Sequence, residues 1–132
     1  MEQQTQVAKK KANKETLQKA FDFFYGYSVS IVGKKKAEEF TRSSYEAVQS
    51  YYPNICLILL EDDCRIQFAE DEITGKEVLG LAIWMQHLLT ALKKFMIGLG
   101  KVEAQNITKD IKDQLEALNF YEFFEQAKEL SG

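Results

Sequence analysis

Cysteine and histidine are scarce in this chain of 132 residues. It has two cysteines, Cys56 and Cys64, and one histidine, His87. Two cysteines are too few for a disulfide-stabilised scaffold, so we expect reduced core thiols in a cytoplasmic protein. These three residues do not have the spacing of zinc ligands. The sequence therefore predicts no metal and no cofactor.

Proline and glycine are also rare. One proline and seven glycines leave little room for long loops. The longest apolar segment is interrupted by Gln86, His87, Lys93 and Lys94, so it falls short of the roughly 18 apolar residues of a membrane span. The N-terminal region also lacks the apolar stretch of a signal peptide. We therefore expect one cytoplasmic domain without a membrane span.

An excess of positive charge is missing as well, because the formal net charge is −3. General nucleic-acid-binding proteins are usually basic, so this charge disfavours that function. The chain has neither a glycine-rich phosphate loop nor the nucleophile motif of hydrolases. Acidic residues 61–63 and 70–72 have no calcium-loop spacing, and we interpret them as solubilising turn charges. The sequence predicts that this protein is not an enzyme.

The chain does have one long apolar segment, from Ile73 to Leu99. Thr74 followed by Glu77 is the pattern of a capping box at a helix start. Ile73 and Val78 form the matching hydrophobic staple. Apolar residues then recur at helical spacing, at Val78, Leu81, Ala82, Met85, Leu88, Leu89, Leu92, Phe95, Met96 and Leu99. Only a narrow polar strip remains, so we expect a central helix that is buried on several sides.

Shorter patterns surround the central segment. Helical spacing predicts further helices over residues 13–33, 34–52, 101–118 and 120–130. Asn13 is the expected N-cap of the first, Pro53 ends the second, and Asn119 is the expected N-cap of the last. Two short apolar stretches, 55–60 and 64–68, flank an acidic turn and predict a β-hairpin.

The first twelve residues differ from the rest. Residues 1–12 are polar and basic, with no apolar period. We expect them to form a flexible N-terminal tail, and residues 13–132 to form a single globular domain.

An internal similarity links the two halves of the chain. Residues 32–41 align with residues 99–108, with identical Gly, Lys, Ala and Thr. We interpret this as a duplicated unit, about residues 17–53 and 84–120, although two helix joins could also match by chance. Gly33 and Gly100 are the expected junctions, each with φ > 0 or a tight reversal. The predicted fold class is α+β, mainly α: two pseudo-repeated αα-hairpin units joined by a β-hairpin, plus a C-terminal helix.

The aromatic content exceeds what one small core needs, with nine Phe, six Tyr and one Trp. Aromatic residues are enriched in protein interfaces. We therefore predict a non-catalytic cytoplasmic protein-interaction or regulatory module, with a place in signal transduction, that binds a second copy of itself and another protein. The predicted interface residues lie around the hairpin and on the central helix: Leu57, Leu59, Tyr51, Tyr52, Trp84 and His87.

Two alternative functions remain open. Two helix pairs and a hairpin resemble a winged helix in outline, and Lys34, Lys35, Lys36 and Arg42 would give its second helix a basic start. The acidic hairpin turn would repel phosphate, which makes this nucleic-acid-binding regulator the weaker reading. The other alternative is a binder of a small apolar ligand, which predicts a cavity beside Trp84.

Overall fold

A computed structural model describes residues 2–96, 98 and 102–131. It is mostly helical with one small antiparallel sheet, which confirms the α+β, mainly α class. Its elements are α1 (Glu2–Val32), α2 (Lys34–Gln49), the 3₁₀-helix η1 (Pro53–Leu57), β1 (Ile58–Leu60), β2 (Ile66–Phe68), α3 (Gly75–Phe95), α4 (Ala104–Ile107), the 3₁₀-helix η2 (Lys109–Ile111), α5 (Lys112–Ala117) and α6 (Phe120–Ser131).

The central helix is α3, as the sequence predicts. The Glu77 carboxylate accepts from the Thr74 backbone N–H at 2.8 Å, and the Thr74 hydroxyl accepts from the Lys76 N–H at 3.3 Å, which confirms the capping box. Packing partners come from three sides, since α1, α2 and α6 all contact α3. Its side chains form the middle of the core, including Val78, Leu81, Ile83, Trp84, Met85, Leu88 and Leu92.

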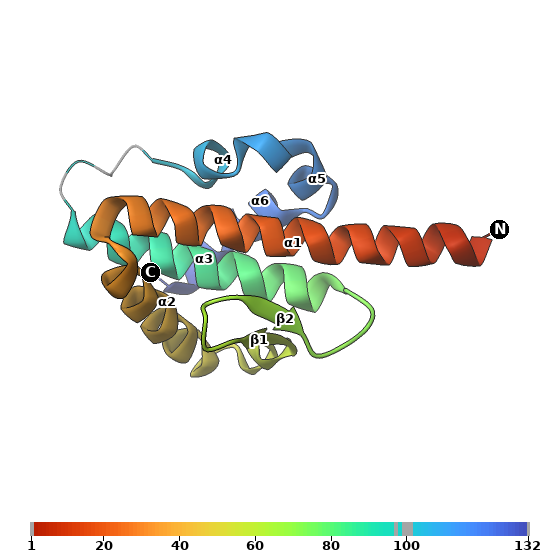
Figure 1. The fold of residues 1–132 in the computed structure, drawn as a ribbon, viewed down its shortest axis with the longest axis horizontal. Helices are drawn as coiled ribbons and strands as arrows, with labels where there is room; N and C mark the ends of the chain where they lie inside the picture. The colour runs from red at the N-terminus through yellow and green to blue at the C-terminus, as the bar shows by residue number, and fades with distance from the viewer. Residues whose placement is uncertain (1, 97, 99–101, 132) are drawn as a thin grey trace.

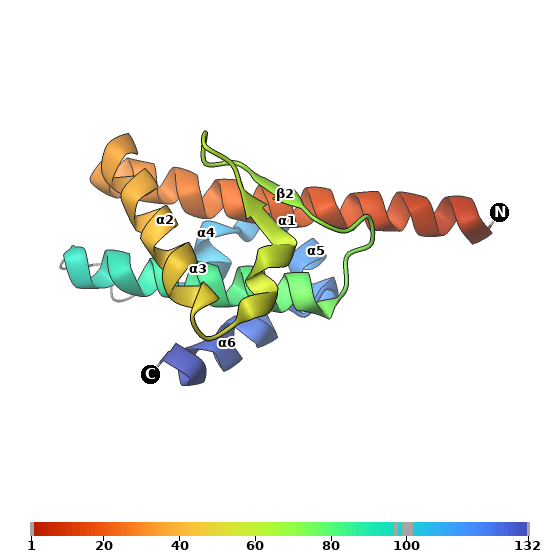
Figure 2. The same cartoon turned by 90° about the horizontal axis from the view of Figure 1, so that it is seen from below.

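The other elements lie in layers around α1 and α3. Figure 1 shows α4 and α5 on one side of α1, with α2 and the hairpin on the other. Figure 2, which shows the molecule from below, shows the hairpin in front of α1 and in the same outer layer as α2. The hairpin pairs Ile58 with Phe68, Leu59 with Gln67 and Leu60 with Ile66.

Gly33 forms the predicted junction between α1 and α2. Its φ is +85° and its ψ is 164°, a conformation that is open almost only to glycine. The prediction for Gly33 is therefore confirmed. Gly100 lies outside the described residues. Gly98 has φ +103° shortly after the end of α3.

Several predicted boundaries are wrong, including that of the second strand, which begins at Ile66 rather than at Cys64. Helix α1 begins at Glu2 rather than at an Asn13 cap, because residues 2–12 are rich in Gln, Lys and Ala, which favour helix. The flexibility of this segment stays a prediction. The first strand starts at Ile58, because Pro53 fixes φ at the start of η1 and residues 53–57 form a 3₁₀ turn. The second helix ends at Gln49 rather than at residue 52.

The predicted helix over residues 101–118 is broken into α4, η2 and α5. Thr108 (φ −109°, ψ 23°) and Ile111 (φ −124°, ψ 27°) both leave helical geometry. Both residues are β-branched, which lowers helix propensity. Asn119 is not an N-cap of the expected kind: its φ of +63° places it in the left-handed region between α5 and α6.

The internal repeat is not confirmed by the fold. Helix α2 is continuous, whereas its counterpart is broken and packs chiefly on α1 and α6. One local feature is shared. The hydroxyls of Thr41 and Thr108 are both buried and donate to the carbonyls of Ala37 and Ala104, at 2.7 and 2.8 Å.

No helix among the described residues is both long enough and apolar enough to cross a membrane.

Candidate interaction surface

The backbone carbonyls of the β-hairpin accept hydrogen bonds from side chains of two helices, α1 and α2. From α2, Arg42 donates to the carbonyls of Glu61 (3.3 Å) and Asp62 (2.6 Å). The Tyr45 hydroxyl, also on α2, donates to the Ile58 carbonyl at 2.6 Å. From α1, Gln18 Nε2 donates to the Ile66 carbonyl at 3.4 Å. These contacts hold the hairpin between α1 and α2.

The two faces of the hairpin have different environments. Ile58 and Ile66, on the inner face, are 0% and 5% exposed and belong to the core. Leu59 points the other way and is 42% exposed, and its partner Gln67 is also exposed. No described residue buries these two side chains, so the outer face is an uncovered sheet face.

The turn of the hairpin is tight and carries an unusual cysteine. Glu61 N–H donates to the Arg65 carbonyl at 2.8 Å, and Cys64 N–H donates to the Glu61 carbonyl at 3.1 Å. Cys64 has φ +58°, the left-handed residue that closes a three-residue hairpin loop. Burial raises the pKa of the Cys64 thiol, and the nearby Arg42 guanidinium opposes that rise. The thiol is therefore protonated at neutral pH and inert as a nucleophile.

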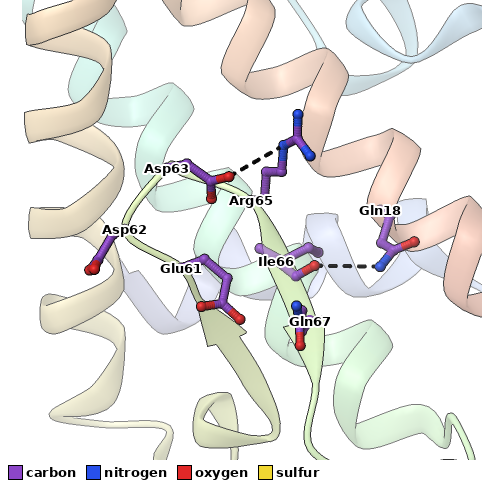
Figure 3. Close-up of a pocket in the computed structure, with 7 residues that line it drawn as sticks. All are labelled: Gln18, Glu61, Asp62, Asp63, Arg65, Ile66 and Gln67. Atoms are coloured by element: carbon purple, nitrogen blue, oxygen red, sulfur yellow. Dashed lines mark hydrogen bonds and ion pairs between the residues drawn. The ribbon is translucent and has the colours of Figure 1, made fainter.

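Two adjoining hollows lie between this hairpin and α1, with volumes of about 580 Å³ and about 460 Å³. Both are bordered by Gln18, Arg65 and Ile66 (Figure 3). We call them together the trough, which is lined by Gln18, Asp22, Glu61, Asp62, Asp63, Arg65, Ile66 and Gln67.

The charge of the trough is mainly negative. Four of its residues carry carboxylates and one carries a guanidinium. Arg65 pairs with Asp63 at 3.5 Å, but both side chains are largely exposed, so the pair contributes little to stability. Burial raises the pKa of Asp22, and Arg65 partly offsets this effect. The sequence interpretation of residues 61–63 as simple turn charges missed this surface, because only the fold brings α1 beside them.

The six predicted interface residues divide into three groups. Tyr51 and Leu59 are 41% and 42% exposed, so they are available for contacts. Leu57 and Tyr52 are half-buried. The Tyr52 hydroxyl donates to the Lys76 carbonyl at 3.0 Å, and its ring lies so close to Gly80 that a Cβ there would approach it to 3.3 Å. Tyr52 therefore has a structural role.

Trp84 does not belong to a surface. It is 0% exposed, and its Nε1 donates to the Thr41 carbonyl at 3.1 Å. Its ring centroid lies 5.1 Å from that of Phe21 and 5.0 Å from that of Tyr45. The prediction that placed Trp84 in an interface is wrong for this fold, because the Trp84 ring packs against Phe21 of α1 and Tyr45 of α2.

His87 is half-buried on α3. Its Nδ1 atom is buried, and no hydrogen-bond partner for it is found among the described residues. Burial lowers the pKa of His87, and the positive charge of Lys94 lowers it further. The imidazole is therefore neutral at physiological pH.

A third hollow, of about 210 Å³, lies between α3, α4 and α6. Polar and charged side chains contribute much of its lining, including Lys93, Glu103, Glu125 and Lys128. Trp84 lines none of the three hollows described here. The exposed apolar residues Phe95 and Met96 lie elsewhere, at the end of α3.

Among the described residues, no three His, Cys, Asp or Glu side chains are grouped so that they could hold a metal ion. No protein-family model matches the sequence, and neither a curated protein nor a solved structure shows significant similarity to it. Functional inference therefore rests on the surface itself.

Proposed function

We propose that this chain is a non-catalytic protein-interaction module that self-associates through the outer face of its β-hairpin. It would work in the cytoplasm, where its two free cysteines stay reduced. A regulatory role, in which this surface also engages another protein, is the natural use of such a module.

The uncovered hairpin face carries this proposal. A two-stranded sheet is only marginally stable alone and needs a further strand or packing against a helix. Here helices cover the inner face, whereas Leu59 on the outer face stays 42% exposed. Leu57 precedes the strand and is half-buried, and Tyr51 is exposed after α2. Apolar and aromatic side chains of this kind favour burial against a partner.

The strands are short, so the sheet face alone is smaller than a stable interface. Specific interfaces bury about 800 Å² on each partner. A dimer must therefore use more than the strands, and the trough beside them extends the available surface.

The alternatives have weaker support. Nucleic-acid binding through a winged hairpin would bring Glu61, Asp62 and Asp63 near phosphates, where like charges repel. An apolar ligand would need an apolar cavity, and the lining of the trough is mostly polar.

Light scattering on three proteins tests the proposal. The wild type should form dimers at micromolar concentration, and Leu59→Glu should weaken them by at least about tenfold, because it buries a charge in the contact. Met96→Glu is the matched control, since Met96 is 38% exposed away from the hairpin. An equal effect of both substitutions, or of neither, would refute a hairpin interface.

A further inference from the structure

The N-terminal part of α1 extends beyond every other element of the fold. Figures 1 and 2 show this projection from two directions. A helical segment of about a dozen residues without packing is marginal in water. The projecting segment therefore gains stability from any surface that receives it.

The sequence of this segment is basic. Lys9, Lys10 and Lys11 are consecutive, and Lys14 follows them. The trough, which lies further along α1 toward its C-terminus, is negatively charged. Its carboxylates are Asp22 on α1 and Glu61, Asp62 and Asp63 at the hairpin turn. One chain thus carries both a basic helical segment and an acidic trough.

We propose that the N-terminal segment of α1 from a second copy docks in the trough, antiparallel to the α1 that walls it, and that the two copies exchange these segments reciprocally. This inference rests on the proposed self-association and identifies what occupies the surface. Oligomers with such twofold symmetry are the commonest kind.

The register of the contact follows from helical spacing. Positions 11, 15, 18 and 22 are separated by four, three and four residues, so they share one face of α1. Gln18 and Asp22 on this face line the trough. A twofold axis between residues 16 and 17 places Lys11 of each copy opposite Asp22 of the other. A parallel arrangement would instead set Lys11 against Lys11.

The hairpin turn extends the same charge pairing. Gln18 contacts Ile66, and Arg65 acts on the charge of Asp22, so the turn lies beyond Asp22 in the direction of the α1 C-terminus. In the antiparallel register, residues 9 and 10 of the second copy lie in that direction too. They are therefore placed near Glu61, Asp62 and Asp63.

The whole chain has a net charge of −3, so two copies repel each other at long range. The attraction must therefore be local, between the basic segment and the acidic trough. This arrangement fixes register and orientation, which is the usual contribution of charge complementarity in interfaces.

A charge-swap experiment tests the inference. Variant A carries K9E, K10E and K11E, and variant B carries E61K, D62K and D63K. Each alone sets like charges against each other in both contacts and should dimerise at least about tenfold more weakly than the wild type. In a heterodimer of A and B, the basic segment of B meets the acidic turn of A, and the acidic segment of A meets the basic turn of B. Residues 9 and 10 therefore face the opposite charge again in both contacts. Sedimentation velocity should show the dimer return only in the mixture.

A matched control uses the second lysine triplet of the chain. K34E, K35E and K36E make the same charge change at the start of α2, where it should leave dimerisation unaltered. Circular dichroism verifies that B folds, and A changes only the projecting segment. If A dimerises like the wild type, or if the A and B mixture stays monomeric, the inference is wrong. If Leu59→Glu still disrupts a dimer that A leaves intact, the hairpin interface stands without it.

Discussion

Gly33 shows how one residue determines where two helices can meet. Its φ of +85° with ψ of 164° lies in a region that costs other residues about 1–3 kcal/mol. A Cβ at this position would meet no atom within 4 Å, so the cost is backbone strain alone. This junction was predictable from the sequence, because a glycine separates two helical patterns and the backbone must change direction there.

Gly33→Ala should therefore lower the free energy of unfolding by about 1–3 kcal/mol. Gly26→Ala is the matched control, because Gly26 lies within α1 with equally open surroundings. It should stabilise the protein by about 0.5–1 kcal/mol, since alanine favours helix. Urea denaturation of both variants measures the difference, and equal midpoints would contradict the role of Gly33.

His87 gives a prediction of pH dependence. Burial lowers its pKa in the folded protein below the usual 6.5. Below about pH 6.5 the unfolded chain takes up a proton that the folded state resists, so stability falls as the pH falls. The slope stays below about 1.4 kcal/mol per pH unit, because a single imidazole binds at most one proton.

His87→Gln removes this titration. Its free energy of unfolding should therefore decline less than that of the wild type between pH 7.5 and pH 5.5. Denaturation curves at the two pH values measure this. Parallel declines would show that His87 does not titrate differently in the two states.

At the scale of elements, α3 packs against α1, α2 and α6. The sequence predicted this central, buried helix. The capping box and the apolar period of α3 are local signals, so they located the helix start correctly. The break between α4 and α5 was not predicted, because β-branched residues such as Thr108 and Ile111 lower helix propensity only slightly. The contact of Thr108 with Tyr121 at 2.7 Å exists only in the tertiary fold. The strand ends were misplaced for a similar reason, since Ile55 turns into the core within η1.

Substitution of Trp84 tests most directly whether α3 forms the centre of the core. Trp84→Ala should cost about 3–5 kcal/mol, because it leaves a cavity between Phe21 and Tyr45. Trp84→Phe keeps most of the ring packing but loses the hydrogen bond to Thr41, so its cost should be smaller. Chemical denaturation ranks the two variants. A loss below about 1 kcal/mol for Trp84→Ala would contradict the central position of α3.

At the scale of the molecule, the sequence identified Leu59 and Tyr51 as surface candidates but also selected the buried Trp84. Apolar content alone does not distinguish a core aromatic from an interface aromatic, since both patterns look alike before the helices pack. The trough was not predicted either, because Asp22 and Glu61 are far apart in sequence and border adjoining hollows only in the folded chain. The proposed self-association rests on these two surfaces together.

Sedimentation equilibrium of the wild-type protein over micromolar concentrations tests the central claim most directly. The chain mass is 15.2 kDa. We predict a concentration-dependent rise of the average mass toward about twice that value, since a twofold dimer is the simplest closed assembly. A single species of 15.2 kDa at every concentration would contradict self-association through the hairpin face.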